Sequence, residues 1–214
     1  MDDEVPITKP YNANDKIRNF IINNKNKVIS LIVITLIIIV SFYGYEKYKT
    51  NTKKNISDKF NTITIEYSEK SKSKTLNELI EIIHEKDPTY SPLSLYFIVD
   101  NKLLADQKQI NGLFNVLINH TSLDTEIKNL VIYKKALFNA DLSNEGDLLK
   151  ELNPLINSKS VWKSHALYLI AEFFYAKEQN QKAKEFFNQI ISLENPNQDI
   201  RLQAEKRLKR DLSE

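Results

Sequence analysis

The three histidines are the side chains of this sequence best suited to metal binding or acid–base chemistry, and they are widely separated. His84, His120 and His165 fall in three different predicted helices or turns. A helical zinc motif needs a second histidine four residues after the first, and His84 is not followed by one. The sequence therefore predicts no metal site.

Nucleophilic and phosphate-binding motifs are also missing from the sequence. The chain has no cysteines, which excludes disulfides, thiolate metal ligands and cysteine nucleophiles. Gly44, Gly112 and Gly146 are isolated glycines and cannot build a glycine-rich phosphate loop. No serine lies in a G-x-S-x-G turn or has the companions expected around an S-x-x-K motif. We therefore expect a protein that is not an enzyme and has no cofactor.

Aromatic side chains gather near the C-terminus, and two interpretations of them stay open. Most are expected to fill the core between two paired helices, whereas the rest would line a groove of the kind in which helical repeats bind peptides or partner helices. Tyr168 and Tyr175 are seven residues apart on one helix face and are the candidates for such a groove. The cluster consists of Tyr168, Phe173, Phe174, Tyr175, Phe186 and Phe187.

The stretch 161–196 matches the pattern of a tetratricopeptide unit, a helix-turn-helix of about 34 residues in which small residues let two helices approach closely. Pro196 follows the second helix, one residue beyond the usual proline position. An ordinary amphipathic helical hairpin is the alternative explanation. The residues predicted to pack within the repeat are Leu167, Ile170, Ala171 and Phe174 on the first helix, and Ala183, Phe187 and Ile190 on the second.

Helical periodicity also precedes this unit. Thr75 and Glu78 have capping-box spacing, Ser91-Pro92 and Ser143 predict further helix starts, and Pro154 predicts a kink or a helix end. The expected fold is all-α, with one N-terminal transmembrane helix followed by an α-solenoid of degenerate tetratricopeptide-like hairpins. A one-sided apolar stripe suited to a terminal capping helix is formed by Ile200, Ala204 and Leu208.

The transmembrane prediction rests on Val28 to Tyr45, a run of uncharged residues between Lys27 and Glu46. As a helix it measures roughly 27 Å, close to the roughly 30 Å hydrocarbon core of a bilayer. A buried helix of a soluble core and a cleaved signal peptide are the alternatives. The first is disfavoured by the lack of a polar face and the second by the lack of a small-residue cleavage pair.

The domain boundaries follow from this segment. We expect a flexible polar tail over 1–27, the transmembrane helix over 28–45, a juxtamembrane helix over 46–74 and the tetratricopeptide-like domain over 75–214. Within the third segment a helical stripe is formed by Ile56, Phe60, Ile63 and Tyr67.

Charge does not define the orientation of the anchor. The net charge is only +2, and lysines flank the span on both sides, so the positive-inside rule is undecided. We attribute the high lysine content to a general Lys, Asn and Ile bias and expect no nucleic-acid partner.

In its layout the chain resembles the YfgM-like family of bacterial inner-membrane proteins. The similarity consists of an acidic start around Asp3 and Glu4, the single span at 28–45, and a helical C-terminal unit running from Trp162 to Leu208. The resemblance implies a cytoplasmic N-terminus, a periplasmic helical domain, and partners among the subunits of the Sec translocon or a membrane-anchored periplasmic chaperone.

We therefore expect a membrane-anchored protein–protein interaction module, an accessory of protein export in the bacterial inner membrane that contacts lipid through residues 28–45. The alternative is a structural adaptor in cell-envelope assembly or division. The sequence leaves the oligomeric state open.

Overall fold

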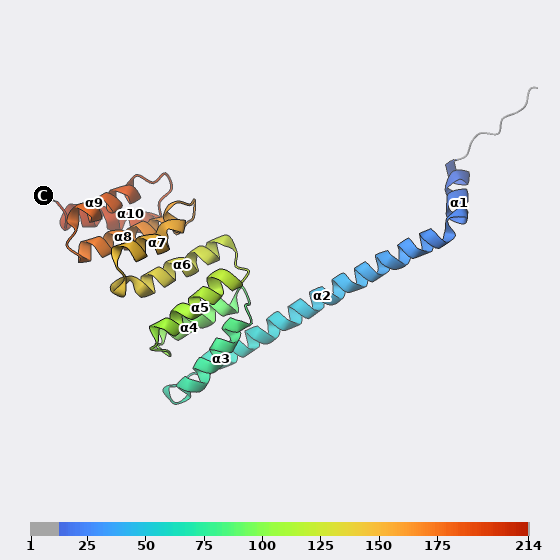
Figure 1. Cartoon of the computed structure of the whole chain (residues 1–214), viewed down its shortest axis with the longest axis horizontal. Helices are drawn as coiled ribbons and strands as arrows, with labels where there is room; N and C mark the ends of the chain where they lie inside the picture. The colour runs from blue at the N-terminus through green and yellow to red at the C-terminus, as the bar shows by residue number, and fades with distance from the viewer. Residues whose placement is uncertain (1–12, 214) are drawn as a thin grey trace, which may run out of the picture. The chain divides into compact units, whose positions relative to one another are not determined.

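The computed structural model describes residues 13–213, and all regular structure in that range is helical (Figure 1). The chain divides into two compact units, one reaching to Lys54 and one starting at Asn55. Residues 1–12, the first part of the predicted flexible tail, lie outside the described range. The all-α prediction is confirmed for the described residues.

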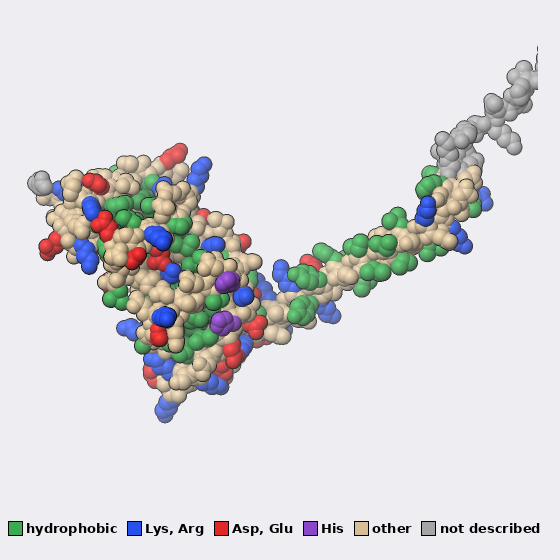
Figure 2. Space-filling model, viewed as in Figure 1, with side chains coloured by type: hydrophobic (Ala, Val, Ile, Leu, Met, Phe, Trp, Pro, Cys, Tyr) green, Lys and Arg blue, Asp and Glu red, His purple; other side chains and the backbone are tan. Residues whose placement is uncertain are grey.

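The first unit contains α1 (Ala13–Asn23) and most of α2 (Lys25–Ile65). Among the described helices, α2 alone is long and apolar enough to cross a membrane, and its apolar window is not buried by other parts of the chain. Figure 2 shows hydrophobic side chains exposed along it. The remainder of the predicted tail differs from the expectation, because it carries α1 and the start of α2 and contains no proline beyond Pro10 to interrupt a helix.

The second unit begins with the last turns of α2. Ile56 and Ile63 are buried there, and Phe60 packs against the same cluster, so this part of the predicted stripe belongs to the core. The helix expected over 46–74 is not continuous, since α2 ends at Ile65 and the short 3₁₀ helix η1 (Glu69–Ser71) follows.

The predicted helix start at Thr75 is wrong. Helix α3 already begins at Lys72, and Thr75 is buried inside it with 3 % of its surface exposed. The capping interaction lies earlier, where the Ser68 backbone N–H donates to the Ser71 hydroxyl over 3.0 Å. This capping box belongs to η1, and the N-cap of α3, Ser71, makes no side-chain capping bond, so Thr75 is a core residue and not a cap.

The second unit continues with eight α-helices in the described range, α3 to α10. Each contacts the next along the chain, and α3 also contacts α5, α6 contacts α8, and α8 contacts α10. Such contacts between each helix and its first and second neighbours are typical of stacked helical hairpins. The bounds are α3 (Lys72–His84), α4 (Tyr90–Asp100), α5 (Gln107–His120), α6 (Thr125–Asn139), η2 (Ala140–Leu142), α7 (Glu145–Ile156), α8 (Lys163–Ala176), α9 (Asn180–Ile191) and α10 (Gln198–Arg210).

Two other local predictions are corrected by these bounds. Asn144, and not Ser143, caps α7, because its side-chain oxygen accepts the backbone N–H of Asp147 at 2.9 Å. Pro154 does not end the helix where it stands, since α7 continues for two more residues to Ile156.

Two hydrophobic clusters make up the core of this unit, and α6 contributes to both. Val131 and Phe138 pack in the cluster formed by α2 to α6, whereas Tyr133 and Ala136 pack in the cluster formed by α6 to α10. A helix with apolar residues on two faces is covered from both sides. Helix α6 therefore joins the two halves of the core.

The hairpin of α8 and α9 has the small-residue packing expected from the repeat pattern. Ala171 and Ala183 have no exposed surface, which lets the two helices approach closely. All seven residues listed for the repeat are buried in the cluster shared by α6 to α10.

The turn between α8 and α9 is closed without glycine. Glu178 adopts a left-handed conformation with φ of 59°, and its N–H donates to the Tyr175 carbonyl over 2.9 Å. The next N–H, from Gln179, donates to the Phe174 carbonyl over 2.9 Å. This is a Schellman ending, usually made with glycine. Lys86 and Lys102 take the same conformation after α3 and α4.

Candidate protein-binding surface

An apolar hollow lies beside α8, and we call it the α6–α8 hollow. It has a volume of about 390 Å³. On α8 its lining residues follow the i, i+3, i+4, i+7 spacing of one helix face, and on the other side they come from the end of α6 and from η2. The lining residues are Leu137, Ala140, Asp141, Leu169, Glu172, Phe173, Ala176 and Lys177.

The hollow combines an apolar floor with a charged rim. Leu137 keeps 49 % of its surface exposed, and Leu142 of η2 close by in the chain is 76 % exposed. The Lys177 amine lies 5.6 Å from the centre of the Phe173 ring, a cation–π arrangement at the rim. Such a surface suits an apolar side chain of another protein, held at its edges by charge.

The two tyrosines proposed for a partner groove lie next to this hollow but are half-buried. The Tyr168 ring meets Phe187 of α9 edge-on, with 5.5 Å between ring centres. Tyr175 lies under the guanidinium of Arg207, 4.9 Å from its ring centre. Both rings are thus held against helices α9 and α10 of the same chain, and their use by a partner stays a prediction.

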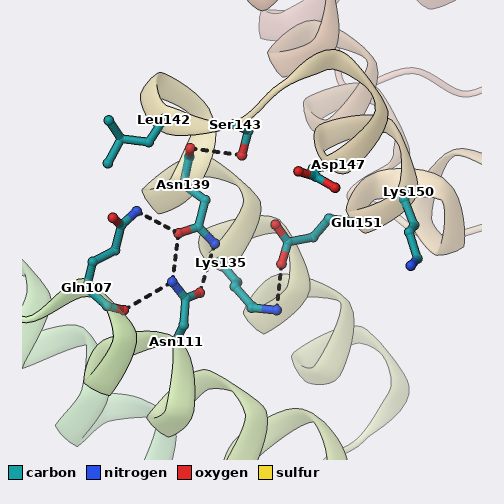
Figure 3. Close-up of a pocket in the computed structure, with 9 residues that line it drawn as sticks. All are labelled: Gln107, Asn111, Lys135, Asn139, Leu142, Ser143, Asp147, Lys150 and Glu151. Carbon is teal, nitrogen blue, oxygen red and sulfur yellow. Dashed lines mark hydrogen bonds and ion pairs between the residues drawn. The ribbon is translucent and has the colours of Figure 1, made fainter.

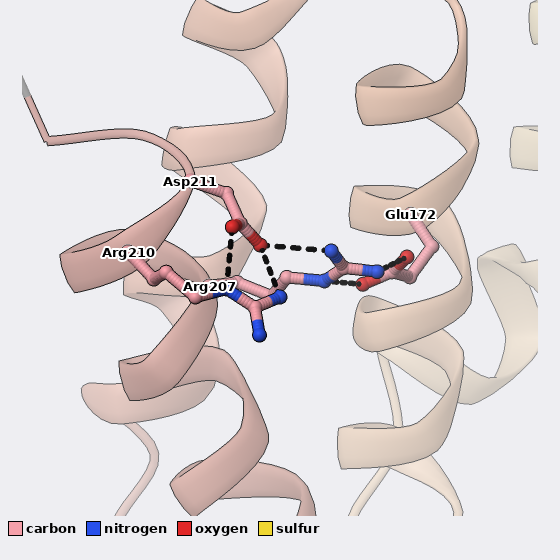
Figure 4. Close-up of polar contacts among 4 residues, drawn as sticks. All are labelled: Glu172, Arg207, Arg210 and Asp211. Atoms are coloured by element: carbon pink, nitrogen blue, oxygen red, sulfur yellow. Dashed lines mark hydrogen bonds and ion pairs between the residues drawn. The ribbon is translucent and has the colours of Figure 1, made fainter.

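Arg207 is the centre of a charged cluster that joins α8 to α10 (Figure 4). Its guanidinium donates two parallel hydrogen bonds to the Glu172 carboxylate, at 2.8 and 2.7 Å, and a third to Asp211 at 2.8 Å. Arg210 also donates to Asp211, at 2.6 and 2.9 Å. The Glu172 carboxylate is therefore fixed at the edge of the α6–α8 hollow.

These contacts set the electrostatics of the cluster. Hydrogen bonds from Arg210 and then Arg207 hold the pKa of Asp211 well below its usual range. The hydrogen bonds to Glu172 and Asp211 raise the pKa of Arg207. Burial raises the pKa of Tyr168, and the neighbouring Glu172 carboxylate adds to that rise. Asp211, Arg207 and Tyr168 therefore keep their ordinary charge states at neutral pH.

A second cavity is lined mainly by polar side chains and lies between α5, α6 and α7 (Figure 3). It measures about 570 Å³. Asn111 and Asn139 bond to each other through both amides, at 2.9 and 2.8 Å, and Gln107 donates to Asn139 at 3.2 Å. Since these amides largely satisfy one another, we assign them to holding α5 against α6.

The histidine that the sequence places beside Trp162 lies in an aromatic cluster. The His165 ring centre is 5.0 Å from that of Trp162 and 5.8 Å from that of Tyr133. Burial lowers the pKa of His165, partly offset by a backbone hydrogen bond to Val161. The Trp162 indole donates to the backbone carbonyl of Glu126 over 3.1 Å, which ties the start of α8 to the start of α6.

No metal-binding group is assembled in the part of the chain that the structure describes. His84 and His120 are exposed at the ends of α3 and α5, while His165 is packed on α8.

Leu169 and Phe173 line the hollow but were not among the partner contacts predicted from the sequence. Leu169 is half-buried, and Phe173 is buried with 9 % of its surface exposed. Their spacing of four on a helix was a detectable signal. It could not be assigned to a hollow, because the other wall comes from Leu137 and Asp141, some thirty residues earlier in the chain.

Comparisons of the chain with protein-family models, with curated proteins and with solved structures find no match. The functional conclusion therefore depends on the residues of this chain and on the layout described from its sequence.

The Arg207 cluster predicts a stability effect with a clear control. Replacing Arg207 by Met should lower the free energy of unfolding by about 1 to 2 kcal/mol, because Glu172 and Asp211 lose charge-assisted hydrogen bonds. Arg207→Lys should recover only part of this, since Lys cannot bond in a fork. Urea unfolding of the detergent-solubilised chain, followed by circular dichroism, measures the difference. Lys209→Met removes a nearby exposed charge and should have little effect, and equal losses in the two Met variants would contradict the role of the cluster.

The buried position of His165 predicts a pH dependence of stability. Its folded-state pKa is below the unfolded value of about 6.5, so the unfolded chain binds the proton more readily. The contribution of neutral His165 is complete above about pH 6.5 and is lost as the pH falls towards the lower folded-state pKa. His165→Gln should flatten the decline in urea midpoint between about pH 7 and about pH 5. His120→Gln, at an exposed position, is the control, and a decline unchanged in His165→Gln would refute the assignment.

Proposed function

We propose that this chain is a membrane-anchored protein-binding module. The observation that carries the proposal is the combination, in one chain, of an uncovered apolar stretch of α2 with a helical unit that offers the apolar α6–α8 hollow. The first feature suits a single-pass anchor. The second suits contact with another protein, because its apolar floor is open and its rim is charged.

We further infer that the helical unit is a solenoid of tetratricopeptide-like hairpins. Support comes from the burial of all seven repeat positions in α8 and α9 and from the contacts of α6 with α8 and of α8 with α10. In a solenoid of this kind the first helices of successive hairpins line a common surface. The α6–α8 hollow lies between two such helices.

The biological role that we propose is an accessory of protein export at the bacterial inner membrane. Its support is the resemblance in layout to the YfgM-like family, which implies a periplasmic helical domain and partners among Sec translocon subunits or a membrane-anchored periplasmic chaperone.

Orientation is the first test of this role. Because the chain has no cysteines, Lys70→Cys and Arg18→Cys each introduce a single labelling site, one on either side of the span. In intact cells a membrane-impermeant maleimide should label Lys70→Cys and leave Arg18→Cys unlabelled until the cells are opened. The reverse pattern would eliminate the export role.

Partner identity is the second test. A photo-crosslinking amino acid at Leu137, in the hollow, should form adducts with translocon subunits or with a membrane-anchored chaperone. The same amino acid at Leu202, which has similar exposure of 52 % on α10, is the matched control. Adducts from Leu137 with cell-wall or division proteins alone would support the structural adaptor instead.

A further inference from the structure

Helix α1 exposes apolar side chains that no described part of the chain covers. Ile17 is 59 % exposed and Phe20 is 64 % exposed, and they lie three residues apart on one face. Ile22 is also exposed but lies outside this face. In an aqueous segment such residues would be unfavourable, so their surroundings require an explanation.

The connection between α1 and α2 is short enough to keep the C-terminal end of α1 close to the membrane surface that α2 would cross. Only Asn24 separates the two helices, and its backbone continues the hydrogen bonding, with N–H to the Phe20 carbonyl at 3.0 Å and carbonyl to the Val28 N–H at 2.9 Å. Even a fully extended chain from Asn23 to Val28 spans at most about 18 Å. The headgroup region on each side of a bilayer is roughly 5 to 7 Å thick, so the C-terminal end of α1 lies within reach of the lipid headgroups.

The charge of this region complements an anionic lipid surface. Between residues 16 and 45 the sequence has four basic residues and no acidic one. Arg18, Lys25 and Lys27 are exposed, and no ion pair among the described residues engages them. Lipid phosphates attract such side chains when they lie next to a span.

We propose that α1 lies in the interface of the membrane that α2 crosses. Ile17 and Phe20 enter the boundary between headgroups and acyl chains, and Arg18, Lys25 and Lys27 contact the phosphates of anionic lipids. This is the behaviour of an interfacial amphipathic helix. The proposal depends on the anchor role of α2 and is independent of the protein partner. In the competing arrangement α1 extends the spanning helix straight into water.

Single cysteines labelled with the fluorophore NBD distinguish the two arrangements, because the chain has no other cysteine. The full chain is reconstituted in vesicles of equal parts phosphatidylcholine and phosphatidylglycerol. Quenching is measured with lipids that carry a nitroxide at a shallow position on the acyl chain. Ile17→Cys and Phe20→Cys report the apolar face. Asn19→Cys, which points about 160° away from Ile17, is the matched control.

Quenching at Ile17 and Phe20 should exceed quenching at Asn19 several-fold. Low quenching at all three positions would overturn the proposal, and high quenching at all three would refute the assigned face. Each cysteine substitution removes one of the two apolar side chains proposed to enter the membrane. Two reporter positions are therefore used, so that each is read out while the other apolar side chain is still present. Replacing the phosphatidylglycerol with phosphatidylcholine removes the net negative charge of the lipid surface and should lower quenching at Ile17, and an unchanged value would overturn the contact with anionic lipid.

A reporter inside the span separates this proposal from the anchor role. Ile38→Cys should be quenched strongly by lipids with a nitroxide deep in the acyl chain. If Ile38 is quenched while Ile17 and Phe20 are not, α2 is an anchor and the interfacial position of α1 is wrong. If Ile38 is not quenched, the anchor role itself fails.

Discussion

Burial of α6 on two faces is the interaction on which the helical unit depends. Val131 and Phe138 complete the cluster on one side, and Tyr133 and Ala136 complete the cluster on the other. None of these helices can cover its own apolar face, so each is stabilised by its neighbours along the chain. Removing α6 would leave two incomplete clusters, each with an apolar face in water. The two clusters are therefore connected through α6, and the helical unit has no single central core to which all of its helices contribute.

The candidate binding surface is a by-product of the same stacking. Leu137 at the end of α6 keeps 49 % of its surface exposed, and with Ala140 and Asp141 of η2 it forms the side of the hollow opposite α8. The fork of Arg207 on Glu172 holds one carboxylate at the edge of the hollow. If the hollow binds a protein as we propose, this carboxylate would lose little further side-chain entropy on binding.

The local spacing of apolar residues was sufficient to predict the helices and to predict the buried residues of the α8–α9 hairpin. Spacings of three and four identify Leu167, Ile170 and Phe174 without any knowledge of their partners. Helix starts were less predictable, because several polar residues near each start can act as caps, and the choice of Asn144 over Ser143 depends on backbone geometry. The ion pair of Glu172 and Arg207 could not be predicted from the sequence. It joins residues 35 positions apart, and nothing in the local sequence specifies which of many charges will meet.

The last turns of α2 connect the proposed anchor directly to the core of the helical unit. Ile56 and Ile63 are core residues of the helical unit and also belong to the same continuous helix as the apolar stretch. If α2 is the anchor that we propose, a force on its apolar stretch would therefore reach Ile56 and Ile63 along the backbone of a single helix. The side-chain packing around these two residues would then bear the load on the anchor.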